Sequence, residues 1–372
     1  MAQKTIVTPL EVSGEVDYDY LVKHFGTQRL DSKLLEKMKK PLPALLRRGL
    51  FFSHRDLDKW LSAHARGDRV SIVSGRGPSE KMHLGHLIPF MVDKYFQDAY
   101  ECEVFIPISD DEKFYVKPNL SFEEAQKYSE DNILDIIALG FNPKLTRIHR
   151  DFEYTKIYKY AAQIAKKVTF STAKAVFGFE NSQNLGWLFY PAMQSAHIYL
   201  PQFLYGAHNT LVPVAIDQDP YMRVLRDVAE YSEFKFVKPS GIYSKFLPPL
   251  TGMAGKMSSS QSETAVWLFD DEKTVRRKVM KHAFSGGATT VEEHRKKGGN
   301  PEVDVAFQWL YLLGLEEDDG KIDRIRGDYL QGKLLSGELK ELLVEKLNAF
   351  LAGHQDAREK ARNKVEQFLL KD

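Results

Sequence analysis

The sequence predicts a doubly wound α/β protein whose chain continues into an all-helical C-terminal region. Short β-branched segments that end in Gly- or Asp-rich turns recur through the first 265 residues, and helical patterns alternate with them. After about residue 265 the strand signals stop. The chain has 372 residues, enough for two or three domains, and we expect an N-terminal extension over 1–60, an α/β domain over 61–265 and a helical domain over 266–372.

The composition excludes several classes of protein. Lys and Arg number 52 and Asp and Glu number 51, so the net charge of +1 excludes a uniformly basic nucleic-acid coat. The single cysteine, Cys102, excludes an intrachain disulfide framework and a Cys-rich zinc or iron–sulfur site. No apolar stretch approaches the roughly 20 residues that span a bilayer, and no targeting segment is visible. We therefore expect a cytoplasmic protein without a membrane partner.

The N-terminal extension shows little periodicity. Residues 1–20 are predicted to be extended or arm-like. Leu30–Met38 is predicted to be a short helix that ends before a Pro-rich break. The segment 47–57 combines a basic pair, an apolar centre and a polar exit, which favours a packed connector.

The next segment carries the clearest strand–turn–helix pattern. Val70–Val73 is β-branched and runs into a Gly-rich turn, after which a helix is predicted from about Met82 to Tyr100. A second strand is predicted over Val104–Ile108. Pro107 lies inside this strand and predicts an edge position or a local irregularity, because proline cannot donate to a ladder.

A helical insertion is predicted over about 115–200. Ser121 and Glu124 form a capping-box pattern that predicts a helix ending near Gly140. The segment 144–200 is predicted to be mainly helical. Strand signals return at Leu211–Ile216.

The last hundred residues contain a strongly amphipathic helix. One face carries apolar side chains at helical spacing. They are Leu339, Leu342, Leu343, Leu347, Phe350 and Leu351.

A first candidate for chemistry is His83-Leu84-Gly85-His86. Residues three apart share a helix face, so both imidazoles can face one ligand. Gly85 allows a flat group to approach the backbone, and the free N–H groups of a helix N-terminus attract phosphate. Alone, the tetrapeptide is more typical of two surface histidines beside a packing glycine.

A second candidate is the loop Lys256-Met257-Ser258-Ser259-Ser260. It follows Gly252 and Gly255, and it offers one cation and three hydroxyls that suit leaving phosphates. Alone, it is more typical of a flexible Ser-rich linker.

Taken together, the two motifs form the paired signature of the class I aminoacyl-tRNA synthetases. Longer segments resemble the tryptophanyl-tRNA synthetases, in their archaeal and eukaryotic branch, from about Phe25 into the C-terminal helices. These segments are GRGPSEKMHLGHLIPF (75–90), SDDEKF (109–114), AIDQDPYMRVLRDVA (215–229), KMSSS (256–260) and KHAFSGG…EEHRKKGGN…VDV (281–305). The resemblance implies a Rossmann-like catalytic domain, a C-terminal tRNA anticodon-binding domain and a homodimer.

The resemblance also implies a two-step reaction with tryptophan, ATP and tRNA(Trp), in which Mg²⁺ accompanies ATP. His83 and His86 are implied to contact phosphates, and Lys256 to neutralise pyrophosphate. Ser258 and Ser259 are implied to assist Lys256. Further nucleotide contacts are implied for Gly75, Arg76, Gly77, Gly85 and Met257. Asp217 and Asp219 are expected to be ribose contacts or simply turn residues.

The implied amino-acid pocket can be placed residue by residue. Glu112, Gln194 and Gln218 match positions that hold the amino and carboxylate groups of the substrate. Ser109 matches a Thr or Ser of the same pocket.

The chain departs from the family pattern at three positions. Ser259 replaces the second lysine of the usual loop, and Lys113 is our candidate for the missing charge. Relatives carry Tyr at Val73 and Gln at Pro107, and those two groups would bind the indole N–H. Tyrosine is therefore the alternative substrate for activation.

Other readings stay open at this point. A non-catalytic tRNA-binding paralogue and a nucleotidyltransferase that makes another adenylate are further alternatives. No HExxH or CxxC pattern occurs, and His282 and His294 lack obvious partner ligands, so we expect no zinc or other protein-held metal.

Overall fold

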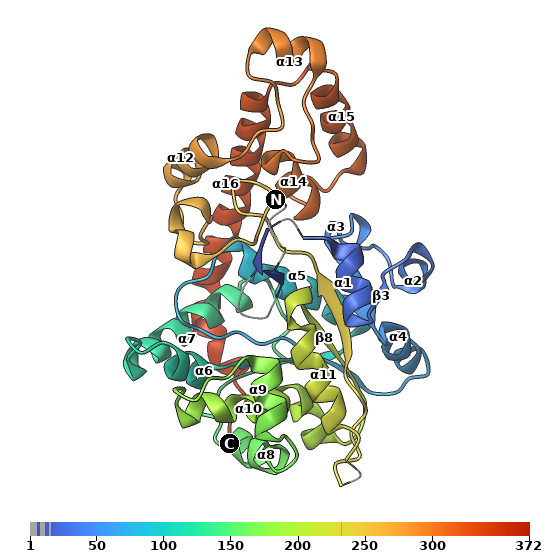
Figure 1. The fold of residues 1–372 in the computed structure, drawn as a ribbon, viewed down its shortest axis with the longest axis vertical. Coiled ribbons are helices and arrows are strands. Elements are labelled where there is room, and N and C mark those ends of the chain that lie inside the picture. The colour runs from blue at the N-terminus through green and yellow to red at the C-terminus, as the bar shows by residue number, and fades with distance from the viewer. Residues whose placement is uncertain (1–5, 8–11, 15, 232) are drawn as a thin grey trace.

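The computed structural model describes residues 6–7, 12–14, 16–231 and 233–372. Its centre is a seven-stranded sheet of order β3-β4-β9-β8-β5-β6-β7 (Figure 1). The strands are β3 (Gln28–Arg29), β4 (Phe51–Arg55), β5 (Val70–Val73), β6 (Glu103–Ile108), β7 (Thr146–Arg150), β8 (Asn209–Ala215) and β9 (Ser240–Ser244). A separate pair joins β1 (Ile6–Val7) to β2 (Val12–Ser13).

As far as β9, one or more helices lie between most successive strands of the main sheet, and after β9 the chain is helical. The first group is α1 (Tyr18–Phe25), α2 (Ser32–Lys37), α3 (Ala44–Arg47), α4 (Leu57–Ala65), α5 (Leu84–Tyr100), α6 (Asp110–Val116), α7 (Phe122–Ile137), α8 (Lys156–Ala165), α9 (Phe170–Phe177), α10 (Leu185–Tyr205), the 3₁₀ turn η1 (Ile216–Gln218) and α11 (Asp219–Val228). The second group is η2 (Ser259–Thr264), α12 (Glu272–His282), α13 (Val291–Lys297), α14 (Val305–Leu312), α15 (Asp319–Leu330), α16 (Ser336–Ala361) and η3 (Arg362–Gln367).

The sheet has helices on both faces, which confirms the doubly wound fold. Successive strand residues point to opposite faces, and they divide between two apolar cores. Ile72, Ile106 and Leu211 pack with α4, α5, α7 and the C-terminal helices. Val73 and Val212 pack with helices α8 to α11 and α1 on the other face.

The strand directions are mixed at one side of the sheet. Strands β9, β8, β5, β6 and β7 are parallel, as predicted. Strand β4 is antiparallel to β9, and β3 is antiparallel to β4. The segment 47–57, which we expected to be a connector, therefore supplies an edge-side strand of the main sheet.

Pro107 lies in an interior strand, so the expected edge position is wrong. Strand β6 pairs with β5 on one side and with β7 on the other. Strand β5 ends at Val73, and the carbonyl of Pro107 accepts instead from the Arg76 N–H, at 2.9 Å, in the following turn. The N–H that proline lacks would face this same side, where the ladder has already ended, so proline is tolerated here.

Strands β7 and β9 were also not predicted. Strand β7 lies inside the segment that we expected to be mainly helical, and its sequence TRIHR offers one strongly apolar side chain. Strand β9 has the sequence SGIYS and is buried throughout. Neither has the apolar alternation that identifies a strand from sequence, because both are stabilised by their neighbours in the sheet.

The C-terminal helices and the sheet share one continuous apolar core. The long helix α16 runs from the tip of the molecule, beside α12 and α14, back to α7 (Figure 1). Beyond η3, Phe368 and Leu370 form backbone hydrogen bonds with Ile148 of β7. Among the described residues, no helix combines the length and apolarity needed to cross a membrane.

Candidate active site

Two neighbouring cavities open where the parallel strands end. The first has a volume of about 350 Å³ and the second about 190 Å³. They share Pro89 of α5 and Ala215 at the end of β8. Ligands of open α/β sheets bind at this edge.

The structure brings most of the predicted site residues to these two cavities. The first cavity is lined by Gly75, Gly77, Pro107, Ser109, Glu112, Lys113, Gln194 and Gln218. The second is lined by His83, Gly85, His86, Asp217, Lys256 and Met257. The predicted residues that line neither are Val73, Arg76, Asp219, Ser258 and Ser259. The two long-range motifs therefore meet in one cavity.

The histidine pair sits at the first turn of α5. The two rings stack with centroids 3.5 Å apart, and the His83 backbone N–H donates to His86 Nδ1 at 3.2 Å. Burial lowers the pKa of His83 to about 3 and holds the pKa of His86 well below its ordinary value. Both rings are therefore neutral at pH 7. Because Nδ1 of His86 accepts, its Nε2 carries the proton that can be donated to a ligand.

Gly85 has a packing role that differs from the one we expected. A Cβ at this position would lie 3.1 Å from Cε1 of the His83 ring. The glycine thus leaves room for the neighbouring histidine, as well as for a ligand.

Lys256 lines the second cavity together with the two histidines. Its Nζ lies 3.0 Å from Oδ2 of Asp217, which is buried. The Met257 N–H donates to the Leu247 carbonyl at 2.8 Å and anchors the loop. The lysine side chain stays 34% exposed, so a cation is held at the opening of the cavity that carries the neutral histidines.

Arg76 points away from the first cavity. Its Nε donates to Oδ1 of Asn132 at 2.8 Å, and that amide donates to the Glu80 carbonyl. One terminal nitrogen, Nη2, is buried without a hydrogen-bond partner in the described part of the chain. Burial lowers the pKa of Arg76 to about 10, so it stays cationic at pH 7.

Polar groups converge at one end of the first cavity. Nζ of Lys113 lies 2.6 Å from Oε1 of Glu112, and the Ser109 hydroxyl lies 3.5 Å from Oε2. Oε1 of Gln194 is buried and accepts no hydrogen bond from any described residue. A carboxylate and an open amide oxygen are acceptors suited to an ammonium group.

Asp219 lies outside the lining of both cavities and is bonded to two neighbouring strands. Its carboxylate is fully buried, 2.9 Å from Nη2 of Arg55, and it accepts from the Tyr243 hydroxyl at 2.7 Å. These bonds tie the start of α11 to β4 and β9. These contacts agree with the second expectation for Asp219, that of a turn residue, and its role as a ribose contact stays a prediction.

Sequence reasoning missed most of the walls of the first cavity. They come from α10, β8 and α11 and are largely apolar or aromatic: Trp187, Tyr190, His197, Ile198, Val212, Pro213, Val214, Tyr221, Met222 and Leu225. Core and pocket side chains have the same spacing on a helix, so no sequence signal separated them.

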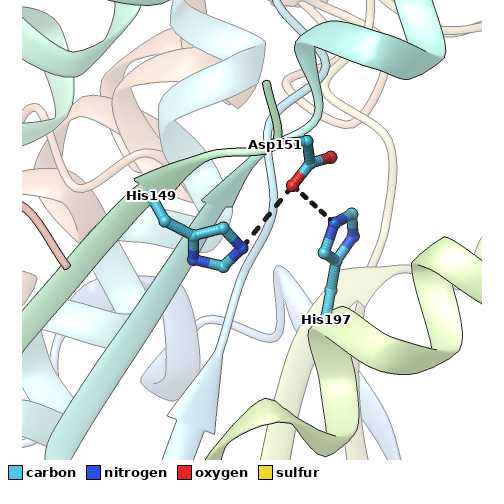
Figure 2. Close-up of side chains that lie close together, drawn as sticks. All are labelled: His149, Asp151 and His197. Carbon is cyan, nitrogen blue, oxygen red and sulfur yellow. Dashed lines mark hydrogen bonds and ion pairs between the residues drawn. The ribbon is translucent and has the colours of Figure 1, made fainter. Parts of the chain in front are cut away.

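A buried cluster lies behind the first cavity (Figure 2). His149 of β7 and His197 of α10 both face Asp151, with Nε2 atoms 3.6 and 2.8 Å from the same oxygen, Oδ1. These side chains offer ligand atoms within 4.8 Å of one another, which is geometry that could hold a metal ion. The absence of a protein-held metal remains a prediction.

Comparisons with known proteins agree with this geometry. The family described as "tRNA synthetases class I (W and Y)" matches residues 65–352. The tryptophan–tRNA ligase of Sulfurisphaera tokodaii is 51% identical over 99% of this chain and 96% of its own length. The chain belongs to the tryptophanyl-tRNA synthetases. The Pyrobaculum aerophilum ligase is 46% identical over 100% of this chain and 98% of its own.

Solved tryptophanyl-tRNA synthetases have the same fold. The Plasmodium falciparum enzyme superposes with a TM-score of 0.88 at 37% identity, covering 95% of this chain and 97% of that one. The Encephalitozoon cuniculi enzyme, solved bound to tryptophan, has a TM-score of 0.86 at 35% identity, with coverage of 95% and 98%. The resemblance inferred from the sequence motifs is thereby confirmed.

Proposed function

We propose that this protein is an ATP-dependent tryptophan–tRNA ligase that acts through a tryptophanyl-adenylate. The observation that carries the proposal is the pair of adjoining cavities. One is large enough for an amino acid and has ammonium acceptors at one end, and the other combines the histidine pair with Lys256. Sequence identities of 51% and 46% to tryptophan–tRNA ligases, over nearly the whole chain, support tryptophan over tyrosine.

The first step joins tryptophan to AMP. The ammonium is held by Glu112 and Gln194, which directs the carboxylate toward the wall that the two cavities share. A carboxylate oxygen bonds to the α-phosphorus of ATP, and the bond from that phosphorus to the bridging oxygen breaks, releasing pyrophosphate. Lys256 and the Nε2–H of His86 stabilise the charge that develops on the leaving group.

The second step transfers the aminoacyl group. A ribose hydroxyl at the 3′ end of the tRNA attacks the carbonyl carbon, and AMP leaves. The substrates supply both nucleophiles, so the protein contributes position and electrostatic stabilisation. The neutral His86 fits this role, because its Nε2–H can donate a hydrogen bond to a phosphate oxygen.

The proposal extends to partners. ATP enters with Mg²⁺, the helices of 266–372 bind the anticodon region of tRNA(Trp), and the enzyme acts as a homodimer in the cytoplasm. Ser258, Ser259 and Lys113 assist Lys256 in compensating the phosphate charge, and Asp217 holds Lys256 in place. The nucleotide lies along Gly75, Arg76 and Gly77.

Amino-acid-dependent ATP–pyrophosphate exchange tests the proposal, with tryptophan and tyrosine in parallel and no tRNA. We expect exchange with tryptophan alone. Exchange with tyrosine would keep the enzyme class and change the substrate. No exchange with either, even after tRNA is added, would favour the non-catalytic tRNA-binding paralogue.

A further inference from the structure

The first cavity poses a problem of recognition for an indole ring. An indole has one polar group, its N–H, and burying this donor without an acceptor costs binding free energy. Val73 and Pro107 bring no side-chain acceptor, and Ile198, Val212 and Leu225 are apolar. The remaining polar groups of the lining are therefore the candidates for accepting the indole hydrogen.

Most polar groups of the cavity are engaged at its ammonium end. Glu112 is paired with Lys113, and Ser109 lies within reach of the same carboxylate. Gln218 follows Asp217, which belongs to the second cavity. His197 lines the cavity from α10, three residues after Gln194.

The hydrogen bond that His197 forms with Asp151 determines which of its ring nitrogens can accept a hydrogen bond from a ligand. Nε2 lies 2.8 Å from Oδ1 of Asp151 (Figure 2), and beside an ionised carboxylate, which can only accept, Nε2 is the donor. A neutral imidazole has one donor and one acceptor nitrogen, so the donating Nε2 makes Nδ1 the acceptor. In the described part of the chain Nδ1 forms no hydrogen bond and is not among the buried unpartnered atoms.

The surroundings favour this tautomer. Burial lowers the pKa of His197 to about 4, so that the ring is neutral at pH 7. Burial raises the pKa of Asp111 to about 9 and holds the pKa of the neighbouring Asp151 well above its ordinary value. A proton held on Asp111 leaves Asp151 ionised, and Asp151 then accepts from Nε2 of His197.

The cluster also lies close to Pro107, the position where relatives carry an indole-binding Gln. Pro107 of β6 is in register with His149 of β7, and His149 faces Asp151. His197 and Pro107 line the same cavity, so the His197 ring belongs to the pocket in which Pro107 offers no side-chain acceptor.

We propose that Nδ1 of His197 accepts the hydrogen bond of the indole N–H, and that Asp151 is a positioning residue that fixes the required tautomer. This inference rests on the proposed tryptophan activation. It assigns the selective contact of the pocket to a histidine on α10.

The test compares tryptophan with β-(3-benzothienyl)alanine, in which sulfur replaces the indole N–H. The readout is the ratio of kcat/KM for the two substrates in ATP–pyrophosphate exchange. His197→Leu removes the acceptor at similar volume. We expect it to lower the preference for tryptophan about 10- to 100-fold, while exchange with the sulfur analogue persists and shows that the variant is folded.

Asp151→Asn tests the positioning role. An amide can donate to Nε2 and so favour the wrong tautomer. We expect this variant to lower the same ratio while keeping exchange with the sulfur analogue. An unchanged ratio would overturn the role of Asp151.

His354→Leu is the matched control. His354 is a buried histidine whose Nε2 lies 3.1 Å from Asp135, and it is on α16, outside both cavities. This variant should leave the ratio unchanged.

Two results would overturn the inference. One is an unaltered ratio in His197→Leu when the wild-type protein activates tryptophan. The other is one zinc per purified wild-type chain that is lost in His197→Leu, because Nε2 would then be a metal ligand. If the wild-type protein activates no tryptophan, the proposed function itself fails, so the two failures are distinguishable.

Discussion

At the scale of single residues, the second cavity combines groups of different charge. His83 and His86 are neutral because they are buried, whereas Lys256 is partly exposed and forms an ion pair with Asp217. The cation is held by Asp217 until an anion arrives. A phosphate that enters the cavity can then pair with Lys256 in place of Asp217.

We expect Lys256→Ala to lower tryptophan-dependent exchange about 10²- to 10³-fold, the loss typical when one group that stabilises transition-state charge is removed. Lys346→Ala is the matched control, since Lys346 also pairs with a carboxylate, Glu316, at 3.0 Å but lies far from the cavities in the helical region. Exchange should be unchanged in the control. Equal exchange rates in both variants would contradict the role of Lys256.

Sequence motifs predicted the charged and small residues of the site, and they did so for a physical reason. Glycine, histidine and lysine stand at fixed spacing in turns and helix starts, so their pattern is local. The cluster of His149, Asp151 and His197 is different, because its members come from two elements whose packing no local pattern specifies. Its discovery required the fold.

At the scale of elements, the sequence predicted correctly those helices and strands that have a capping motif or an apolar pattern of their own. The capping box at Ser121 and Glu124 forms as predicted, with the Glu124 N–H donating to the serine hydroxyl and the carboxylate accepting from the Ser121 N–H. Strands β5, β6 and β8 and helix α5 also lie where the sequence placed them. Strands β4, β7 and β9 were missed, because pairing in the sheet stabilises them and their composition does not.

Helix α5 also contains an unusual carboxyl group. Asp93 is fully buried against the sheet, and burial raises its pKa well above the ordinary value. The folded state therefore retains a proton that the unfolded chain has lost. Stability from this group is complete below the unfolded pKa of about 4 and decreases as pH rises through the folded pKa.

We expect Asp93→Asn to remove this pH dependence. The free energy of unfolding of the variant, relative to wild type, should rise between pH 5 and pH 8 by at most about 1.4 kcal/mol per pH unit. Urea unfolding at several pH values measures it. Asp98→Asn, an exposed carboxylate on the same helix, is the control. A difference between Asp93→Asn and wild type that does not change with pH would count against a protonated Asp93.

At the scale of the whole molecule, the C-terminal end of the chain returns to the main sheet. Helix α16 carries it from the far tip past α7 (Figure 1), and the last residues lie along β7, the strand that contains His149. The carboxylate of Asp372 accepts from the Thr155 N–H at 3.0 Å and the Lys156 N–H at 3.1 Å, at the start of α8. The helical region and the sheet are thereby joined at both ends.

Phe368 tests this connection. Its side chain is 2% exposed and belongs to the core beneath the sheet. We expect Phe368→Ala to lower the free energy of unfolding by about 3 kcal/mol, through lost burial and the cavity left behind. Leu330→Ala, at a 51% exposed position of α15, should change it by less than about 0.5 kcal/mol. Equal effects in urea unfolding would contradict a docked C-terminus.

Charging of tRNA tests the central claim most directly. Purified protein is incubated with ATP, Mg²⁺, archaeal total tRNA and labelled tryptophan or labelled tyrosine, and acid-precipitable label is counted. The two-cavity site and the tryptophanyl-tRNA synthetase family predict ATP-dependent charging with tryptophan and none with tyrosine. Charging with tyrosine, or with neither amino acid, would contradict the account.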